Sequence, residues 1–261
     1  MLRKNFLKEK LESGQSVLGT FCTVPSVALC DVLASSEPDF IVIDCEHGPI
    51  SFETAQGMVI ACESQNVSPV VRVADLGAVD ILKSLDIGAH AVQVPNITTA
   101  QNVRKVIEYY KYPPAGNRGF SPFTRAGEYS LDNAKKLTAQ ANRNVLTVVH
   151  IEGLSAIDHI EEILEIKELD IIFLGLFDIS KSLGIPGEVE HPRVIKLLKD
   201  LTGKIDRASK IAGTIAMNAR QMEEFLDWGL RYITYSVDCE VIRKTYRDIY
   251  AHRRKLNPVS S

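Results

Sequence analysis

Short and nearly continuous apolar segments alternate with longer segments of helical periodicity along the whole chain. Val103, Val106, Ile107 and Tyr110 follow the i, i+3, i+4, i+7 spacing of an amphipathic helix, and residues 194–201 repeat it. The short segments are rich in Val, Ile, Phe and Leu, which is typical of parallel strands buried on both faces. They predict eight strands, which in chain order are residues 17–24, 40–44, 69–73, 91–94, 146–151, 171–175, 211–216 and 232–235.

Eight strand–helix units in one chain predict a (β/α)8 barrel, the TIM-barrel class of α/β fold, with an extra N-terminal helix near residues 3–13. The length of 261 residues suits one such barrel, so we expect a single domain over residues 1–261. A doubly wound open sheet is the alternative, but it requires a glycine-rich turn after its first strand. Thr23-Val24-Pro25-Ser26 follows that strand instead, which favours the barrel.

Composition and charge narrow the classes of function. Lys and Arg number 30 and Asp and Glu number 33, so the formal net charge of −3 excludes a strongly basic nucleic-acid-binding protein and gives no basis for membrane-surface binding. No apolar run approaches the ~20 residues of a membrane span, and residues 1–10 lack the apolar core of a signal peptide. The five cysteines form no CxxC pair, so we expect reduced thiols in a cytoplasmic protein.

Charged and polar residues follow the carboxyl ends of several predicted strands. In a (β/α)8 barrel the active site is built at this end, so these residues are candidates for chemistry. Their recurrence favours a catalytic or ligand-binding protein over a purely structural one. The candidate positions are Asp44-Cys45-Glu46-His47-Gly48, Arg72, Pro95-Asn96, His150 and Glu152, Asp178, and Ser236-Val237-Asp238.

Glu152 and Asp178 end two neighbouring predicted strands. Adjacent strands lie ~4.8 Å apart, so two carboxylates at their ends can share one cation. Oxygen ligands favour Mg2+ or Mn2+, with water and substrate completing the coordination, whereas no His and Cys cluster indicates zinc. The alternative is that each residue caps the following helix, a role that suits Asp178 before Ile179-Ser180.

Two histidines and an arginine complete the set of candidates. His47 follows Asp44, and a carboxylate beside an imidazole can make it a general base, although a loop histidine is commonly only a hydrogen-bonded polar residue. Arg72 lies among valines and needs an anionic partner, either a structural carboxylate or a substrate carboxylate or enolate. His150 shares a strand face with Glu152, so we expect it to point at the same site.

Several common motifs are missing from the sequence. It has no GxGxxG, Walker or GxSxG motif and no glycine pair after the last two strands, which disfavours nucleotides and phosphosugars as substrates. Lys83 and Lys210 lie outside interior strand positions, so a Schiff-base mechanism has little support. The long irregular stretch 112–129 indicates a functional or interaction segment, or else a surface excursion that only packs.

These residues also match a known family over about residues 18–238. The matching motifs are Ile43-Asp44-Cys45-Glu46-His47, Pro69-Val70-Val71-Arg72, Leu85-Asp86-Ile87-Gly88-Ala89, Val94-Pro95, Tyr112-Pro113-Pro114-Ala115-Gly116-Asn117-Arg118-Gly119, Arg125-Ala126, Ile151-Glu152 and Asp178-Ile179-Ser180. In this order they are highly specific. The sequence resembles the HpcH/HpaI family of metal-dependent class II pyruvate aldolases, typified by 4-hydroxy-2-oxoheptanedioate aldolase.

The resemblance implies a role for each residue of the site. Glu152 and Asp178 correspond to the metal ligands, His47 to the base, and Arg72 to the group that stabilises the enolate. In the family a divalent ion binds the keto oxygen and carboxylate of pyruvate, and the enolate attacks an aldehyde, or the reverse cleavage occurs. The resemblance leaves Mg2+, Mn2+ and Co2+ open as the ion.

The resemblance also implies roles beyond these four residues. Asp44 and Asp86 correspond to carboxylates that tune the histidine. Arg125 corresponds to an arginine that reaches the distal end of the aldehyde from a neighbouring subunit. Family members are hexamers built from trimers, so a homo-oligomer, either a trimer or a hexamer, is implied. The predicted substrate-binding residues are Phe21, Arg125, His150, Phe177 and Asp178.

The chain departs from the family pattern around the substrate pocket. His150 replaces the usual Gln, Phe177 replaces a small residue that is often preceded by Gly-Pro, Phe21 replaces a Trp, and Ser236 replaces a Gly. We therefore expect the metal and enolate chemistry to be retained while the substrate differs. Phe177 should narrow the space beside the keto acid. As a hypothesis, His150 offers a positive charge to an additional carboxylate, as in oxaloacetate.

Three functions follow from these observations. The leading hypothesis is a carbon–carbon lyase that cleaves or forms a 4-hydroxy-2-oxo acid, with pyruvate and an aldehyde as the small-molecule partners. The second is a condensation of oxaloacetate with an acyl thioester, as in the branch of the family that makes citrate for siderophores. The third is a non-catalytic oligomeric barrel that binds a metal or ligand, against which the complete set of Glu152, Asp178, His47 and Arg72 argues.

Overall fold

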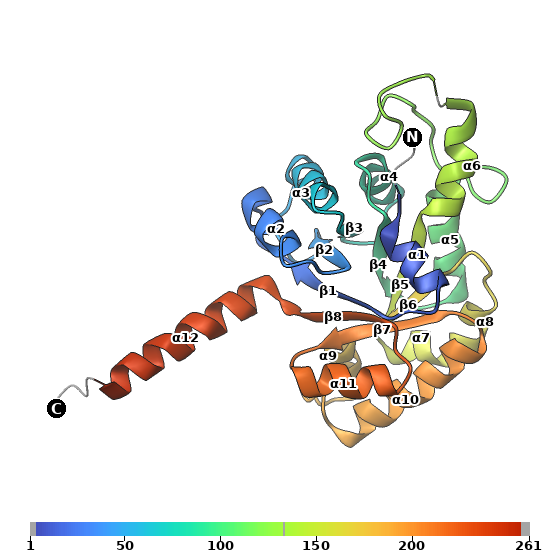
Figure 1. Cartoon of the computed structure of the whole chain (residues 1–261). Helices are drawn as coiled ribbons and strands as arrows, with labels where there is room; N and C mark the ends of the chain where they lie inside the picture. Colours follow the sequence, from blue (N-terminus) through green and yellow to red (C-terminus); the bar gives the residue numbers. More distant parts are fainter. Residues whose placement is uncertain (1–3, 133, 257–261) are drawn as a thin grey trace.

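The computed structural model describes residues 4–132 and 134–256, and in it eight parallel strands close into a barrel. The strands pair in chain order, and β1 closes the ring by pairing with β8 (Figure 1). The predicted (β/α)8 barrel is therefore confirmed. The strands are β1 (Val17–Cys22), β2 (Phe40–Asp44), β3 (Ser68–Arg72), β4 (Ala91–Ile97), β5 (Leu146–Ile151), β6 (Ile171–Leu174), β7 (Ile211–Ala216) and β8 (Tyr232–Val237).

Helices surround the barrel and return the chain from the carboxyl end of each strand to the amino end of the next. The predicted helical segments at 103–110 and 194–201 lie within α5 and α10. The helices are α1 (Phe6–Glu12), α2 (Val27–Ala34), α3 (Phe52–Ser64), α4 (Ala78–Asp86), α5 (Ala100–Tyr110), α6 (Ala134–Asn144), α7 (Leu154–Asp158), α8 (Ile160–Leu164), α9 (Leu176–Ser182), α10 (Pro192–Arg207), α11 (Ala219–Asp227) and α12 (Asp238–Leu256).

The ends of the first and last strands differ from the prediction because a carboxylate joins them. β1 stops at Cys22, since the backbone N–H groups of Thr23 and Val24 both donate to the carboxylate of Asp238 at 3.0 Å. β8 continues to Val237, through Ser236 at a positive φ of 54°. This polar contact joins the end of β1 to the start of α12 at the seam of the barrel.

The core has two layers on either side of the strands. An outer layer fills the space between the strands and the surrounding helices, and an inner layer fills the barrel itself. All five residues of β2 are buried, as expected for a strand covered on both faces. The inner layer includes the rings of Phe40 and Tyr232, which stack with centroids 4.3 Å apart.

The extra N-terminal helix closes the floor of the barrel. α1 begins at Phe6 because the side chain of Asn5 accepts the N–H of Lys8, and Arg3, at the start of the predicted range, lies outside the described residues. Leu7 and Leu11 pack against the inner layer. The amide of Asn5 also donates to the backbone carbonyls of two residues that precede barrel strands, which fixes the helix to the floor.

The last helix projects away from the barrel instead of lying along it. Figure 1 shows α12 extending into solvent beyond β8. Its exposed apolar side chains form a stripe, because Ile242, Tyr246 and Ile249 follow one another at spacings of four and three residues and the others lie beside them. These exposed residues are Val241, Ile242, Tyr246, Ile249, Tyr250 and Leu256.

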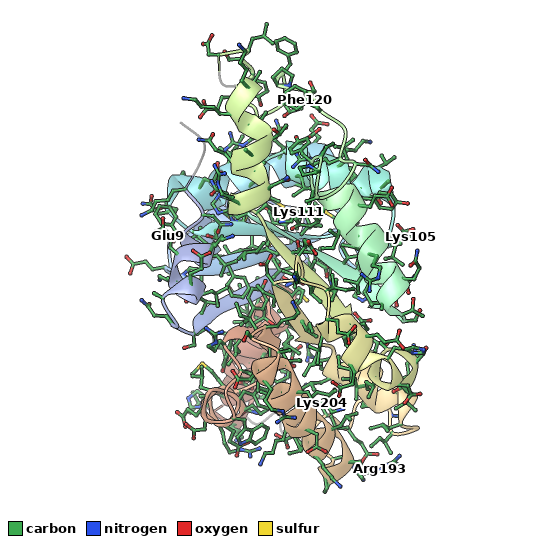
Figure 2. All side chains as sticks on the ribbon, turned by 90° about the vertical axis from the view of Figure 1, so that its right-hand side faces the viewer. Glu9, Lys105, Lys111, Phe120, Arg193 and Lys204 are labelled. Carbon is green, nitrogen blue, oxygen red and sulfur yellow. The ribbon has the colours of Figure 1, made fainter. Side chains whose placement is uncertain are left out.

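Most charged side chains lie on the outer surface of the helices. Figure 2 shows Lys105 and Arg193 on that surface, whereas Lys111 is buried and donates to two backbone carbonyls. In the described part of the chain, no helix combines the length and apolar character that crossing a membrane requires. All five cysteines are free thiols, of which Cys22, Cys30 and Cys62 are buried.

We expect Leu7→Ala to lower the free energy of unfolding by about 2–5 kcal/mol, because Leu7 is fully buried and its truncation leaves a cavity in the barrel floor. Urea unfolding followed by circular dichroism measures the change. Glu9→Ala on the exposed face of the same helix is the control and should change stability by less than about 0.5 kcal/mol. Equal losses in the two variants would show that α1 contributes nothing to the core.

Candidate active site

A cavity of about 290 Å³ opens at the carboxyl ends of the strands. This is where the active site of a (β/α)8 barrel lies. The cavity brings together residues from seven of the eight strands and from the loops after them. The predicted site residues that line it are Phe21, Asp44, His47, Arg72, His150, Glu152, Phe177 and Asp178.

A tight turn after β2 carries His47 to the mouth of this cavity. The N–H of Gly48 donates to the carbonyl of Asp44 at 3.1 Å and closes the turn. A Cβ atom at Gly48 would lie 2.5 Å from that carbonyl oxygen and 2.6 Å from the carbonyl oxygen of Thr23, so only glycine fits. The side chain of His47 is 66% exposed, which leaves its imidazole accessible to a bound substrate.

Arg72 is held at the cavity wall by a bidentate ion pair. Its Nε and Nη2 atoms donate to the two carboxylate oxygens of Asp44 at 2.8 and 2.6 Å, and its Nη1 lies 3.1 Å from Oε2 of Glu46. The guanidinium carbon lies 4.7 Å from the ring centroid of Phe21. Because guanidinium has five N–H groups, the two hydrogen bonds to Asp44 leave others for a substrate oxygen.

Asp44 has a different partner from the one that its expected role implies. Its carboxylate binds Arg72 and accepts the backbone N–H groups of Glu46 and His47, and no hydrogen bond joins it to the imidazole. The carboxylate nearest the imidazole is that of Glu46, whose Oε2 lies 4.0 Å from Nε2 of His47. The turn geometry causes this difference, since it directs the side chain of Asp44 toward β3.

Glu46 belongs to the predicted strand-end segment 44–48, but the sequence alone assigned it no role. Burial raises the pKa of its carboxyl group, and the neighbouring carboxylates of Glu152 and Asp44 raise it further, while Arg72 and His47 lower it. Its position two residues after a strand-ending Asp was the only available signal. That position alone does not show that the side chain turns inward.

His150 belongs to a buried column of side chains that reaches Glu152. Its Nδ1 lies 2.8 Å from Oε1 of Glu152, and its Nε2 lies 2.9 Å from the amide oxygen of Gln93. The amide nitrogen of Gln93 in turn donates to the hydroxyl of Tyr232 at 2.8 Å. The ring of His150 stacks on Phe173, with centroids 4.6 Å apart, so the column is fixed on every side.

This arrangement corrects the hypothesis that His150 presents a positive charge to a substrate carboxylate. Both ring nitrogens already have partners, and the residue is only 1% exposed. Burial lowers the pKa of His150, but its two ring nitrogens face two acceptor oxygens, those of the Glu152 carboxylate and the Gln93 amide, and a neutral imidazole can donate to only one of them. Burial alone would raise the pKa of Glu152, but the hydrogen bond from His150 and the charge of Arg72 outweigh it, so the pKa is lowered and Glu152 is ionised.

Phe177 and Asp178 enter the cavity from the first turn of α9. Asp178 is half-exposed and its Oδ1 lies 3.4 Å from Nζ of Lys181. Phe177 is 46% exposed beside it and forms part of the rim. Gly175, just before this helix, makes room for Glu152, because a Cβ atom there would lie 2.8 Å from Cγ of that residue.

The donor set of the cavity fits a hard divalent cation. Glu152 and Asp178 line the same space and offer only oxygen atoms, the ligands that Mg2+ and Mn2+ prefer. Within residues 4–132 and 134–256 no three His, Cys, Asp or Glu side chains converge on a metal position. Two carboxylates are nevertheless enough for Mg2+, which commonly keeps water and substrate oxygens as its other ligands.

Asp86 and Arg125 lie outside this cavity. Asp86 is the last residue of α4, which returns the chain to the amino ends of the strands, so it cannot reach the opposite end of its own barrel. Its Oδ1 instead lies 2.7 Å from Nη2 of Arg118, and Arg125 pairs with Glu63. The roles that the resemblance implied for Asp86 and Arg125 are therefore not available within one chain.

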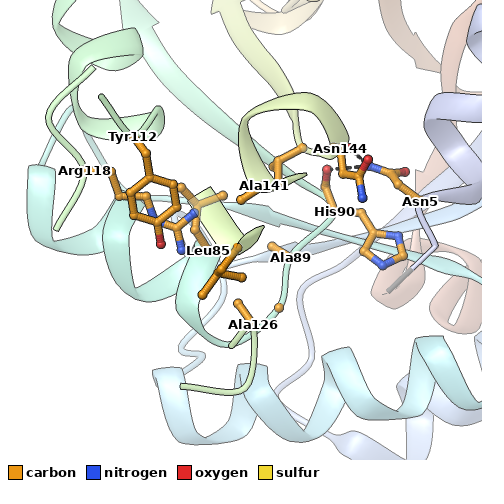
Figure 3. Close-up of a pocket in the computed structure, with 12 residues that line it drawn as sticks. Asn5, Leu85, Ala89, His90, Tyr112, Arg118, Ala126, Ala141 and Asn144 are labelled. Carbon is orange, nitrogen blue, oxygen red and sulfur yellow. Dashed lines mark hydrogen bonds between the residues drawn. The ribbon is translucent and has the colours of Figure 1, made fainter. Parts of the chain in front are cut away.

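A second and smaller cavity lies near Arg118, at the amino-terminal end of the barrel. It measures about 60 Å³ and is lined mainly by apolar side chains, with Arg118 and Tyr112 at one end and Asn5 and His90 at the other (Figure 3). The guanidinium of Arg118 lies 4.6 Å from the ring centroid of Tyr112. This cavity is separate from the residues described above.

Known proteins resemble this chain over nearly its whole length. A family model described as HpcH/HpaI aldolase/citrate lyase matches residues 18–245. The chain is 30% identical over 238 residues to the 2-keto-3-deoxy-L-rhamnonate aldolase of Escherichia coli K12, covering 91% of this chain and 88% of that protein. The chain belongs to the HpcH/HpaI aldolase/citrate lyase family.

Solved structures of the HpcH/HpaI family agree with this assignment. An HpcH/HpaI aldolase from Desulfitobacterium hafniense DCB-2 has a TM-score of 0.92 at 26% identity, covering 98% of this chain and 99% of that one. The citrate synthase SbnG has a TM-score of 0.88 at 26% identity, covering 98% and 100%. The resemblance drawn from the motifs is thus confirmed, and the protein is an enzyme of the carbon–carbon lyase class.

We expect Gly175→Ala to lower the free energy of unfolding of this HpcH/HpaI enzyme by about 1–3 kcal/mol, because the added methyl group overlaps Glu152. Thermal unfolding measures the loss. Gly153→Ala is a matched control on the neighbouring strand end, since nothing lies within 4 Å of its added Cβ. If both variants melt like the wild type, the contact between Gly175 and Glu152 does not constrain the site.

Proposed function

We propose that the protein is a metal-dependent class II aldolase that cleaves or forms 4-hydroxy-2-oxo acids, with pyruvate and an aldehyde as the smaller partners. The observation that carries this proposal is the presence of Arg72, Glu152 and Asp178 around one cavity, with His47 at its mouth. The name of the E. coli relative, a 2-keto-3-deoxy-L-rhamnonate aldolase, supports the same substrate class.

Glu152 and Asp178 would hold the divalent ion, for which Mg2+ and Mn2+ are the first candidates and Co2+ the third. Class II aldolases of this family use a divalent metal, and the oxygen donors here suit one. When bound, such an ion polarises the keto group of a 2-oxo acid. Glu152 is suited to the role because its lowered pKa keeps it ionised and His150 fixes one of its oxygens.

The remaining residues of the chain would orient the substrate and move the proton. Arg72 is held rigidly by Asp44, so its unused N–H groups face the cavity as preorganised donors for an enolate oxygen. His47 would take the proton on its imidazole. Phe21 and Phe177 supply apolar walls that exclude water and limit the size of the aldehyde.

A condensation of oxaloacetate with an acyl thioester is the second candidate. The likeness to citrate synthase SbnG over the whole chain favours it. The same cavity would bind the 2-oxo acid in both reactions, so the two candidates differ in the electrophile. The rim formed by Phe177 is where that difference would be decided.

We expect Mn2+-dependent exchange of the pyruvate methyl protons with deuterium, which NMR follows without knowledge of the acceptor. Glu152→Ala should abolish the exchange by removing a cation ligand, whereas Glu188→Ala, an exposed carboxylate elsewhere, should leave it unchanged. Exchange that ignores added Mn2+ or survives in Glu152→Ala would contradict the aldolase proposal. Citrate formation from oxaloacetate and an acyl thioester, without pyruvate exchange, would establish the second candidate.

We also propose that the enzyme is a homo-oligomer, a trimer or a hexamer. The apolar stripe of α12 supports this, because a contiguous exposed apolar surface marks an association site. The side chains of Phe123 and Leu131, in the loop region after α5, are exposed as well. A role for Arg125 at a neighbouring site would then become possible.

Light scattering after size-exclusion chromatography should give three or six times the mass of 28.9 kDa. We expect the double variant Tyr246→Glu and Ile249→Glu to reduce the measured mass, because it places charges in the apolar stripe of α12. Lys244→Gln on the same helix is the control and should keep the wild-type mass. A monomeric wild-type protein would refute this proposal.

A further inference from the structure

The contacts of the Asp44 carboxylate are directed at Arg72 and at the turn after β2, and none of them is to the imidazole of His47. Its Oδ1 accepts Nε of Arg72 at 2.8 Å and the backbone N–H groups of Glu46 and His47 at 3.1 and 3.3 Å, and its Oδ2 accepts Nη2 of Arg72 at 2.6 Å. Three of these contacts fall on Oδ1, and the shortest one holds Oδ2 against Arg72, so the carboxylate is directed at β3 and at its own turn. The side chain is also only 1% exposed, so it cannot turn toward the imidazole of His47.

In Glu46, by contrast, one carboxylate oxygen lies near the imidazole of His47. Its Oε2 lies 4.0 Å from Nε2 of His47 and 3.1 Å from Nη1 of Arg72. This oxygen is buried and makes no hydrogen bond with the described residues. It thus faces the imidazole with a free lone pair, in a partly desolvated place where one charge acts strongly on another.

We propose that Glu46 is the positioning residue that orients the imidazole of His47 and stabilises its protonated form during proton transfer. The proposal rests on the aldolase function above. In the exchange step a C–H bond of the pyruvate methyl group breaks, its electron pair forms the C=C bond of the enolate, and the proton moves to the imidazole of His47. The imidazolium then lies beside the Glu46 carboxylate, and the reverse step returns a proton to carbon.

Arg72 links the carboxylate of Glu46, beside His47, to the carboxylate of Asp44. Its guanidinium contacts Glu46 through Nη1 and Asp44 through Nε and Nη2, so one side chain fixes both carboxylates. The charged groups that face Glu46 are Asp44 from β2, Arg72 from β3, Glu152 from β5 and His47 from its own turn. Among these, only His47 lies at the mouth, where a proton can come from substrate or leave to water.

The pH dependence of the exchange rate tests the proposal. A neutral imidazole acts as the base, so the rate rises with pH along an acid limb. Loss of the Glu46 charge disfavours the imidazolium, so Glu46→Gln should move this limb to lower pH by about one unit and slow the exchange at its plateau about tenfold. Asp44→Asn should instead slow the exchange at every pH without moving the limb, because it releases Arg72.

Two further variants complete the comparison. Glu46→Asp keeps the charge but withdraws it by one methylene, so it should move the limb less than Glu46→Gln does. Glu53→Gln, an exposed carboxylate at the start of α3, should behave as the wild type. A limb that moves in Asp44→Asn and stays in place in Glu46→Gln would overturn the proposal and assign the role to Asp44.

A measurement without turnover separates this inference from the proposed function. The ring protons of His47, assigned by their loss in His47→Ala, report its titration midpoint by NMR in the absence of substrate and metal. The midpoint should fall in Glu46→Gln and stay within about 0.3 unit in Asp44→Asn. Absence of pyruvate exchange in the wild type would refute the aldolase function, whereas an unchanged midpoint in Glu46→Gln would refute the role of Glu46.

Discussion

The ion pair between Asp44 and Arg72 joins the last residues of β2 and β3, which lie opposite each other in the sheet register. Both side chains are largely buried, and each charge needs the other, because removing one partner from such a pair leaves an uncompensated charge that costs about 3–5 kcal/mol. The pair also sets the site. It orders the turn that carries His47, and it holds the guanidinium against Phe21 at the cavity wall.

The barrel makes this pair possible by bringing distant chain segments to one edge. Parallel strands in chain order place the ends of β2, β3, β5 and β6 around a common space, so side chains from positions 44 to 178 meet there. Deeper inside the barrel, the rings of Phe173 and Tyr232 form an apolar surrounding for the hydrogen-bonded column of His150 and Gln93. A fixed column under Glu152 keeps that carboxylate oriented without any bound ligand.

The local pattern of the sequence was sufficient for the strands, the barrel and the strand-end residues, because burial on both faces and the position of each run along the chain are local properties. The same pattern did not predict which side chains pair with each other at the site. Asp44 follows its strand as predicted, but its choice of Arg72 over His47 depends on the register of β2 against β3. Asp86 shows the opposite case, since the direction of α4 alone places it at the far end of the barrel.

The charge balance of the site connects its parts. Asp44, Glu46, Glu152 and Asp178 bring four carboxyl groups to the region of one guanidinium, and both ring nitrogens of the buried His150 already face Glu152 and Gln93. A 2-oxo acid is itself an anion, so its carboxylate meets net repulsion in a cavity of this composition. A divalent ion on Glu152 and Asp178 would offset this negative charge. The positive charge of Arg72 stays paired with Asp44 and Glu46.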